Sequence, residues 1–329
     1  MSQPLRAAIR GTGYAVPDTI MTNEDFEKII DTSDEWITKR TGIKERRICS
    51  EGESTRTLAV QAARNAIADA GIEADQLDLI ICATITPDLP FPATACLVQN
   101  ELGLSGVPAF DVSGACSGFV YGLTIGSKFI ETGMHKRVMV IGVDVMSRFT
   151  DYSDRGSCIL FGDGAGAVIL EATEEDRGVV FTTMHAEGSG WDFIHVPAGG
   201  TAKPPSAETV AAGEHYVRMR GRDVYKFAVE KMQWLLGECM DQAGLTVDDV
   251  DLVVPHQVNV RIIKSATEKF DFPMDKIYLN IERYGNTSGA SVPMALAEAR
   301  EKGLVKSGDN LLLVAFGAGL TWAGAVVKM

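Results

Sequence analysis

The sequence predicts an α/β protein built from two similar halves. The segment at residues 70–81 has a near copy at residues 243–254, an offset of 173 residues. In each copy a helical pattern ends at a glycine, a short acidic loop follows, and a β-branched strand comes next. The strands are continuous apolar runs without alternation. This pattern indicates sheets that are covered by helices on both faces and whose strands run mostly parallel.

The other elements recur in the same order in both halves. Helices are expected at residues 57–70, 117–133, 224–243 and 288–303. Apolar strands are expected at residues 107–112, 137–143 and 310–316. The stretch 196–213 is rich in Pro, Gly and Ala and has little periodicity, so we expect an exposed connecting loop that could act as a lid.

Length and composition are those of a globular protein with about two domains, which we place at 1–175 and 176–329. Residues 5–10 run directly into a strand-like pattern, which predicts a cytoplasmic protein without a leader peptide. The uncharged stretch 310–327 just reaches the length of a membrane span. Glycines at 317, 319 and 324 interrupt it, however, and favour two buried strands joined by a turn.

The net charge of −13 argues against a broad surface for nucleic acid or anionic membranes. The six cysteines show no CxxC or Cys/His spacing, so neither disulfides nor a metal site are expected. Two basic segments, 39–47 and 218–222, could bind an anionic ligand, although a solvated charged surface also explains them. The glycine-rich segment 162–166 lacks the pattern of a phosphate-binding loop and predicts tight packing.

Cys116 is the candidate nucleophile. It lies in the segment 112–119, where an apolar strand breaks into small residues and then enters a helical pattern. The free N–H groups at the start of a helix, and the positive end of its dipole, favour a thiolate over a thiol. Glycines on both sides allow a sharp bend and close approach of a substrate. Without its context, a cysteine is more often a small buried hydrophobic side chain.

Two further candidates lie in the second half. Ligands gather at the carboxyl ends of strands and the amino ends of helices, so the residues that follow each apolar strand are the first to consider. His256 ends the strand after the second repeat copy, where a purely structural histidine is also common. Asn286 lies in a glycine-bracketed turn that opens a helix, a position also typical of a helix cap. The duplicated architecture predicts that Cys116, His256 and Asn286 meet between the halves.

The sequence resembles the β-ketoacyl-acyl-carrier-protein synthases of type III, which belong to the thiolase-like superfamily. The resemblance covers nearly the whole chain and rests on motifs at residues 33–37, 40–43, 114–118, 161–166, 256–259, 285–288 and 315–317. It implies a thiolase-like α/β fold of two similar halves in αβαβα layers, and a homodimer. It also implies that Cys116, His256 and Asn286 form the catalytic triad.

The same resemblance assigns the residues around the triad. It implies an oxyanion hole from the backbone N–H groups of Cys116 and Ala318, where the family commonly has glycine in place of Ala318. It places Phe91 and Phe316 at the acyl pocket, with Phe91 reaching across the dimer, which suggests a short primer. The implied coenzyme A contacts are Trp36, Arg40, Thr32, Arg155, Gly221 and Asn259. The implied carrier-protein contacts are Arg261, Lys264, Lys269 and Gln257, although Lys264 and Lys269 are also explained as solvated lysines.

The implied reaction is a decarboxylative Claisen condensation that initiates fatty acid biosynthesis. An acyl-CoA primer loads Cys116 and then joins a malonyl unit on acyl-carrier protein, giving 3-oxoacyl-acyl-carrier protein, CoA and CO2 without a further cofactor. An α/β-hydrolase is the main alternative, because residues 114–118 fit a nucleophile elbow. The internal repeat, and an asparagine after the histidine, count against it. A carrier-binding scaffold, or a hydroxymethylglutaryl-CoA synthase-like or secondary-metabolite condensing enzyme, also remains open.

Overall fold

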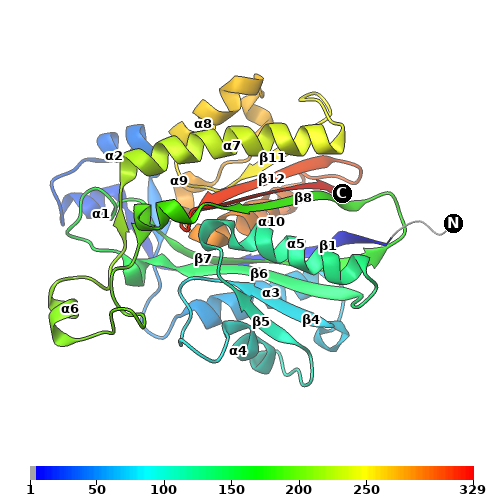
Figure 1. Cartoon of the computed structure of the whole chain (residues 1–329), viewed down its shortest axis with the longest axis horizontal. Helices are drawn as coiled ribbons and strands as arrows, with labels where there is room; N and C mark the ends of the chain where they lie inside the picture. Colours follow the sequence, from blue (N-terminus) through cyan, green and yellow to red (C-terminus); the bar gives the residue numbers. More distant parts are fainter. Residues whose placement is uncertain (1–4) are drawn as a thin grey trace.

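Two β-sheets and three layers of helices make up the fold (Figure 1). The computed structural model of the chain describes residues 5–329. The first sheet has the strand order β1 (Arg6–Ala15), β7 (Asp163–Thr173), β6 (Arg137–Val145), β4 (Leu79–Ala83) and β5 (Ala109–Val112). The second has the order β11 (Leu252–Pro255), β12 (Asn310–Gly317), β13 (Thr321–Lys328) and β8 (Gly178–Ala186).

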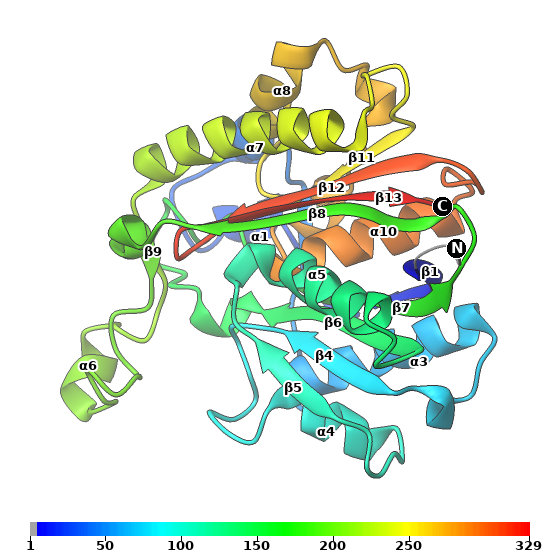
Figure 2. The ribbon, with the colours of Figure 1, turned by 45° about the vertical axis from the view of Figure 1, so that its right-hand side comes forward.

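Helices cover both faces of each sheet (Figure 2). The outer face of the first sheet carries α3 (Thr55–Ala70) and α4 (Thr94–Glu101). The outer face of the second carries α7 (Gly221–Ala243), on which α8 (Val260–Thr267) packs. Between the sheets lie α5 (Gly118–Glu131) and α10 (Ser291–Glu301). The predicted αβαβα layering is therefore confirmed.

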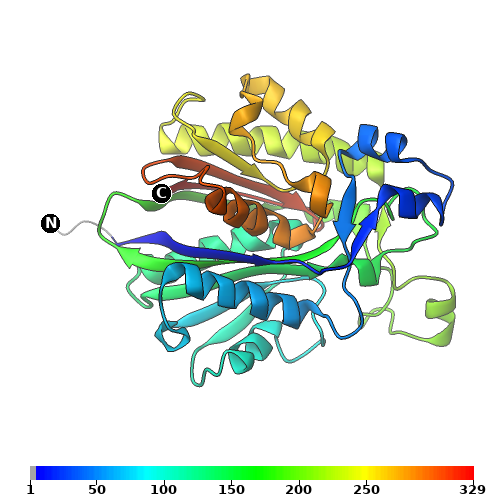
Figure 3. The same ribbon diagram turned by 180° about the vertical axis from the view of Figure 1, so that it is seen from behind.

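Smaller elements gather at the end of the sheets where β5 and β11 finish (Figure 3). They include the helices α1 (Asn23–Glu27), α2 (Asp34–Thr41) and α9 (Ile281–Tyr284). Two short antiparallel strand pairs lie with them, β2 (Ile20–Thr22) with β3 (Glu45–Arg47), and β9 (Ile194–His195) with β10 (Arg218–Met219). Since strand ends and helix starts also lie here, this is the end of the molecule where a ligand site is expected.

The internal repeat is visible in the structure. Helix α3 ends at Gly71 and α7 ends at Gly244, and both glycines adopt the left-handed conformation, with φ of 63° and 67°. After a short acidic connection, strands β4 and β11 follow them. Each of the central helices, α5 and α10, is preceded by a single 3-10 turn, at residues 115–117 and 288–290. We retain 1–175 and 176–329 as the proposed division, with one sheet in each part.

The prediction of mostly parallel strands is wrong. β4 is parallel to β5 and β6, and β11 is parallel to β12. However, β7 runs antiparallel to β1 and β6, and β13 runs antiparallel to β12 and β8. Only residues 318–320 separate β12 from β13, and so short a connection permits only antiparallel pairing. The continuous apolar runs thus report burial on both faces and not strand direction.

The expected helices and strands are present in the structure, and their first and last residues differ from the expected ones by a few positions. The stretch 310–327 forms two strands joined by a turn, and none of the helices in residues 5–329 is long and apolar enough to cross a membrane. The connecting segment 196–213 contains a short helix, α6 (Ala207–Ala211), that the sequence analysis missed. Ser206 caps this helix, and its hydroxyl accepts a hydrogen bond from the N–H of Thr209. A serine at the start of a helix is a local sequence signal, but the Pro, Gly and Ala content of the segment favoured a loop.

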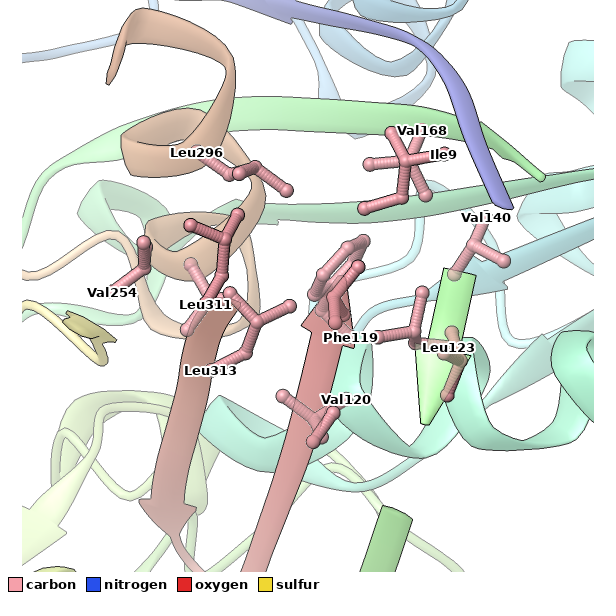
Figure 4. Packing of buried hydrophobic residues seen from close by; sticks show 14 of the residues in the cluster. Ile9, Phe119, Val120, Leu123, Val140, Val168, Val254, Leu296, Leu311 and Leu313 are labelled. Carbon is pink, nitrogen blue, oxygen red and sulfur yellow. The ribbon is translucent and has the colours of Figure 1, made fainter. Parts of the chain in front are cut away.

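A buried apolar cluster fills the space between the sheets (Figure 4). Phe119 and Leu123 of α5 lie in it with Leu296 of α10, against Val140 of the first sheet and Leu313 of the second. All five side chains are fully buried. Because Phe119 is three residues beyond Cys116, this packing fixes the start of the helix that carries the candidate nucleophile.

Candidate active site

The structure brings Cys116, His256 and Asn286 to one cavity between the two halves. The cavity has a volume of about 240 Å³, and its other lining is almost entirely apolar. Phe316 and Ala318 line it as well. The three polar residues come from the start of α5, the end of β11 and the turn before α10. This is the meeting point that the repeat predicted.

Cys116 lies in the 3-10 turn between β5 and α5. Its thiol donates a hydrogen bond to the Ser288 hydroxyl at a distance of 3.5 Å. Burial in the apolar cavity raises the pKa of the Cys116 thiol to about 12, and the hydrogen bond to Ser288 only partly offsets this shift. The expectation that the helix start yields a thiolate is therefore wrong for the resting protein, because desolvation outweighs it. The proton must leave Cys116 during acyl transfer itself.

His256 is buried and neutral. Burial lowers the pKa of its imidazole to about 3, so the ring carries no charge near neutral pH. Its Nδ1 lies 2.6 Å from the Ser291 hydroxyl oxygen on α10. The ring of Phe316 packs edge-on against it, with centroids 5.5 Å apart. With Nδ1 engaged, the remaining nitrogen Nε2 is available to a ligand in the cavity.

Asn286 is held by backbone contacts on both sides. Its N–H donates to the carbonyl of Leu160 at 2.8 Å, and its own carbonyl accepts from the N–H of Gly162 at 3.1 Å. Its side-chain Oδ1 accepts a hydrogen bond from the N–H of Ser288 at 2.9 Å. Because Oδ1 is occupied by a donor, the amide group presents its Nδ2 hydrogens for use elsewhere. Asn286 is thus oriented as a hydrogen-bond donor.

The turn after β12 passes directly against Cys116. A Cβ atom at Gly317 would lie 2.7 Å from the backbone nitrogen of Cys116, so only glycine permits this approach. The next residue, Ala318, lines the cavity beside Cys116. Its methyl group is accommodated at the position where the family commonly has glycine. The contact brings together the backbone segments of the expected oxyanion hole.

An open groove leads from the surface to this cavity. Five of the six expected coenzyme A residues line it: Trp36, Arg40, Arg155, Gly221 and Asn259. The guanidinium groups of Arg155 and Arg40 lie 4.6 Å and 5.2 Å from the centroid of the Trp36 ring. Leu160 and Met219 line both the groove and the cavity. An elongated ligand can therefore extend from the basic groove to Cys116.

Asn259 and Arg261 also line the groove, at the start of α8. The Asn259 side chain accepts from the N–H of Arg261 at 2.9 Å and donates to the carbonyl of Arg40 at 3.1 Å. It therefore caps α8 and ties that helix to α2. Lys264 and Lys269 are exposed near the far end of α8 and line none of the cavities described here.

Three expected site residues lie elsewhere. Gln257 is wrong as a carrier-protein contact, because it is only 1% exposed and bonds to the backbone of Pro255, Tyr278 and Asn280. Its amide serves the internal structure. Thr32 lines neither the groove nor the cavity, and its hydroxyl is buried without a hydrogen-bond partner among residues 5–329. Phe91 is 85% exposed and stands outside the cavity of its own chain.

The sequence analysis missed several residues of the site. Ser288, in the turn after Asn286, contacts Cys116, and Ser291, the first residue of α10, contacts His256. Arg222 and Lys226 line the groove. The basic segment 218–222 was a usable signal for Arg222, but in that segment Arg218 and Arg220 form ion pairs with acidic residues instead.

The glycine-rich segment 162–166 serves packing, as predicted. A Cβ atom at Gly166 would lie 2.5 Å from the backbone nitrogen of Met294, and one at Gly162 would overlap the carbonyl of Tyr284. The segment therefore lets β7 approach α10 and the turn of Asn286. Within residues 5–329 there is no group of three or more His, Cys, Asp or Glu side chains that could hold a metal ion.

The raised pKa of Cys116 predicts how the resting protein reacts with an alkylating agent. Iodoacetamide labels thiolates, so labelling of Cys116 should accelerate about tenfold per pH unit between pH 7 and 9. Mass spectrometry of the Cys116 peptide measures this rate, with the exposed Cys96 labelled in the same sample as a reference. A rate that is already constant at pH 7 would show a resting thiolate and contradict the raised pKa of Cys116.

Comparison with known proteins identifies the family to which this chain belongs. Two family models match the chain, 3-oxoacyl-(acyl-carrier-protein (ACP)) synthase III over residues 110–188 and its C-terminal model over residues 240–329. The chain is 49% identical over 328 residues to a β-ketoacyl-(acyl-carrier-protein) synthase III of Caldanaerobacter subterraneus, covering 100% of this chain and 99% of the relative. The Clostridioides difficile relative is 49% identical over 323 residues, covering 98% of each chain.

Solved structures agree. The crystal structure of 3-oxoacyl-(acyl-carrier-protein) synthase III from Aquifex aeolicus is 47% identical, with a TM-score of 0.91, covering 98% of this chain and 100% of that one. The priming β-ketosynthase of a polyketide biosynthetic pathway is 31% identical, also with a TM-score of 0.91, covering 100% and 98%. The chain belongs to the β-ketoacyl-acyl-carrier-protein synthase III family of thiolase-like condensing enzymes.

Proposed function

We propose that the protein condenses an acyl-CoA primer with malonyl-acyl-carrier protein, the step that initiates fatty acid biosynthesis. The observation that carries this proposal is the continuous path from the basic groove to the cavity that holds Cys116, His256 and Asn286. The products are 3-oxoacyl-acyl-carrier protein, CoA and CO2. All steps use thioesters and groups of the protein, so the proposed reaction needs no cofactor.

The first half-reaction loads the primer onto Cys116. The adenine of coenzyme A would stack on the Trp36 ring and displace the Arg155 guanidinium, which lies 4.6 Å from the centroid of that ring, while Arg40 and Arg222 neutralise the phosphates. The pantetheine arm then extends past Leu160 and Met219 into the cavity. The sulfur of Cys116 attacks the thioester carbonyl, and CoA leaves with the proton that Cys116 loses. One thioester replaces another, so the exchange is nearly balanced in free energy.

The second half-reaction makes a carbon nucleophile by decarboxylation. When CO2 leaves the malonyl thioester, the electron pair moves to the thioester oxygen as an enolate. In the tautomer in which the Ser291 hydroxyl donates to Nδ1, the proton of neutral His256 lies on Nε2. Nε2–H of His256 and Nδ2–H of Asn286 can then both donate to that oxygen, and their bonds strengthen as charge develops. An imidazolium would be a stronger acid and could quench the enolate by protonation. The low pKa of His256 therefore suits this role.

Carbon–carbon bond formation completes the cycle. The enolate carbon attacks the acyl group on Cys116, and the resulting oxyanion is held by the backbone N–H groups of Cys116 and Ala318. Collapse of this intermediate releases the sulfur of Cys116 as a thiolate, which takes up a proton. The apolar lining keeps water away from the acyl-enzyme, which favours condensation over hydrolysis.

The cavity volume and the exposed edge of the first sheet indicate the primer length and the assembly. A cavity of about 240 Å³ must hold the end of the pantetheine arm as well as the acyl group, which favours a short primer such as acetyl. The edge strand β5 leaves one side of the first sheet unpaired within the chain, and Phe91 is exposed. Both features support a homodimer in which Phe91 closes the acyl pocket of the partner. The cytoplasmic location stays a prediction.

The carrier protein would dock on α8 beside the mouth of the groove. Arg261, Lys264 and Lys269 form this basic surface in a chain of net charge −13. An acidic carrier protein would be repelled by most of the molecule, so local positive charge directs it to the groove.

Substitution of Asn286 by alanine separates the two half-reactions. Asn286→Ala should still form the acyl-enzyme, because Cys116 and the groove are intact, but malonyl decarboxylation should fall about a hundredfold with the loss of one enolate donor. Mass spectrometry of the Cys116 peptide after incubation with acyl-CoAs of graded length measures loading, and CO2 release measures decarboxylation. Equal loss of both activities would contradict this division of roles, and an acyl label on any residue other than Cys116 would refute the mechanism.

Charge reversal on α8 tests the docking surface. Lys264→Glu should raise KM for malonyl-acyl-carrier protein roughly threefold to tenfold and leave KM for malonyl-CoA unchanged, because Lys264 lies outside the groove. Lys306→Glu is the matched control, since it makes the same charge change at an exposed lysine distant in sequence from α8. If both variants behave alike, or if KM for malonyl-CoA rises equally, α8 is not the docking surface.

A further inference from the structure

The turns that precede α5 and α10 have the same backbone conformation. Ala115 and Ser288 are separated by 173 residues, the offset of the internal repeat, and both have positive φ, 47° and 51°. Left-handed conformations are uncommon for residues other than glycine, so their recurrence at equivalent positions marks the two turns as counterparts. By this equivalence Cys116 corresponds to Gly289.

The N–H groups at these corresponding positions have different partners. In the proposed reaction the N–H of Cys116 binds the oxyanion of a substrate. The N–H of Gly289 instead donates to Oδ2 of Asp144 at 2.9 Å. Asp144 lies at the end of β6, in the opposite half of the chain, and is fully buried. A carboxylate of the protein thus occupies the second of two equivalent anion-binding positions.

Hydrogen-bond donors surround Asp144. Oδ1 accepts from the N–H of Ile85 at 2.9 Å and from the hydroxyls of Thr84 and Thr86, both at 3.1 Å. Burial raises the pKa of Asp144, and hydrogen bonds from Ile85, Ser288, Gly289 and Thr84 act against that shift. Among residues 5–329 no lysine, arginine or histidine forms an ion pair with it. Burial of a carboxylate without a cationic partner costs folding free energy, and its presence beside the site indicates a functional role.

The contacts of Asp144 lead directly to the catalytic asparagine. Gly289 follows Ser288, and the N–H of Ser288 donates to Oδ1 of Asn286 at 2.9 Å. Asp144 therefore fixes, from the first half, the turn that orients the amide of Asn286 in the second half. We infer that Asp144 is a positioning residue for malonyl decarboxylation, acting through Gly289 and Ser288 on Asn286. This inference rests on the proposed function.

Asp144 supports Asn286, but its negative charge disfavours the thiolate of Cys116. It is one of the causes that raise the pKa of the Cys116 thiol, after the larger effect of burial. His256, which lines the cavity with Cys116, is neutral and does not offset this charge. Removing the charge of Asp144 should therefore lower the pKa of Cys116 and raise its thiolate fraction, while releasing the turn of Asn286. A purely structural residue would not move the two sites in opposite directions.

Asp144→Asn tests the inference with two readouts on one protein. We expect malonyl decarboxylation to fall about tenfold to a hundredfold, because displacement of a donor by a fraction of an ångström costs rate on this scale. Acyl loading should persist, and the iodoacetamide labelling rate of Cys116 at pH 8 should rise about threefold or more. Asp111→Asn is the matched control: it removes a carboxylate of strand β5, in the same sheet, that accepts from two backbone N–H groups at the start of α4. It should change neither readout.

Each outcome is decisive. Unchanged decarboxylation in Asp144→Asn, or a parallel loss of loading and decarboxylation in folded protein, would overturn the positioning role. If Asp144→Asn does not fold, Thr84→Val removes one donor to the same carboxylate, and it should lower decarboxylation several-fold while loading is retained. Equal activities in Thr84→Val and the parent protein would then overturn the inference. Failure of the parent protein itself to decarboxylate malonyl-acyl-carrier protein would instead refute the proposed function.

Discussion

The arrangement of this protein depends on the meeting of two helix starts in the gap between two sheets. α5 and α10 occupy the central layer, and their preceding turns contact each other through Cys116 and Ser288. The core around Phe119 and Leu296 fixes both helices against both sheets. Every proposed step of the reaction uses a group at or beside this contact. The duplication of the fold therefore creates the site, because neither half alone contains both the nucleophile and the donors.

Burial at this contact decides the charge states of the site. The thiol of Cys116 and the imidazole of His256 are both neutral in the resting protein, for the same reason. Charge arises only when substrate is present, first on sulfur during acyl transfer and then on the enolate oxygen. Fixed donors that are already aimed at those positions need little reorganisation when the charge appears. The buried carboxylate of Asp144, outside the cavity, helps to hold the donor Asn286 in place.

Much of this architecture could be predicted from the sequence, since it follows from local patterns. The repeat located Cys116, His256 and Asn286 at equivalent strand and helix ends, and the glycine C-caps gave the helix boundaries within a few residues. Strand direction could not be predicted, because apolar runs report burial and not polarity. Gln257 was misassigned because its position next to His256 does not reveal that its amide satisfies buried backbone groups. The role of Asp144 could not be predicted from the sequence, because its hydrogen-bond partners are distant in sequence and carry no charge.

The proposed reaction joins two acyl units in the cavity through a carbon–carbon bond. It does not merely transfer one acyl group to water. The stoichiometry of a single reaction mixture tests this most directly. With acetyl-CoA and malonyl-acyl-carrier protein, the account predicts one CoA and one CO2 released for each 3-oxobutanoyl-acyl-carrier protein formed. Release of CoA together with free acetate, in the presence of malonyl-acyl-carrier protein and without the 3-oxoacyl product, would contradict it.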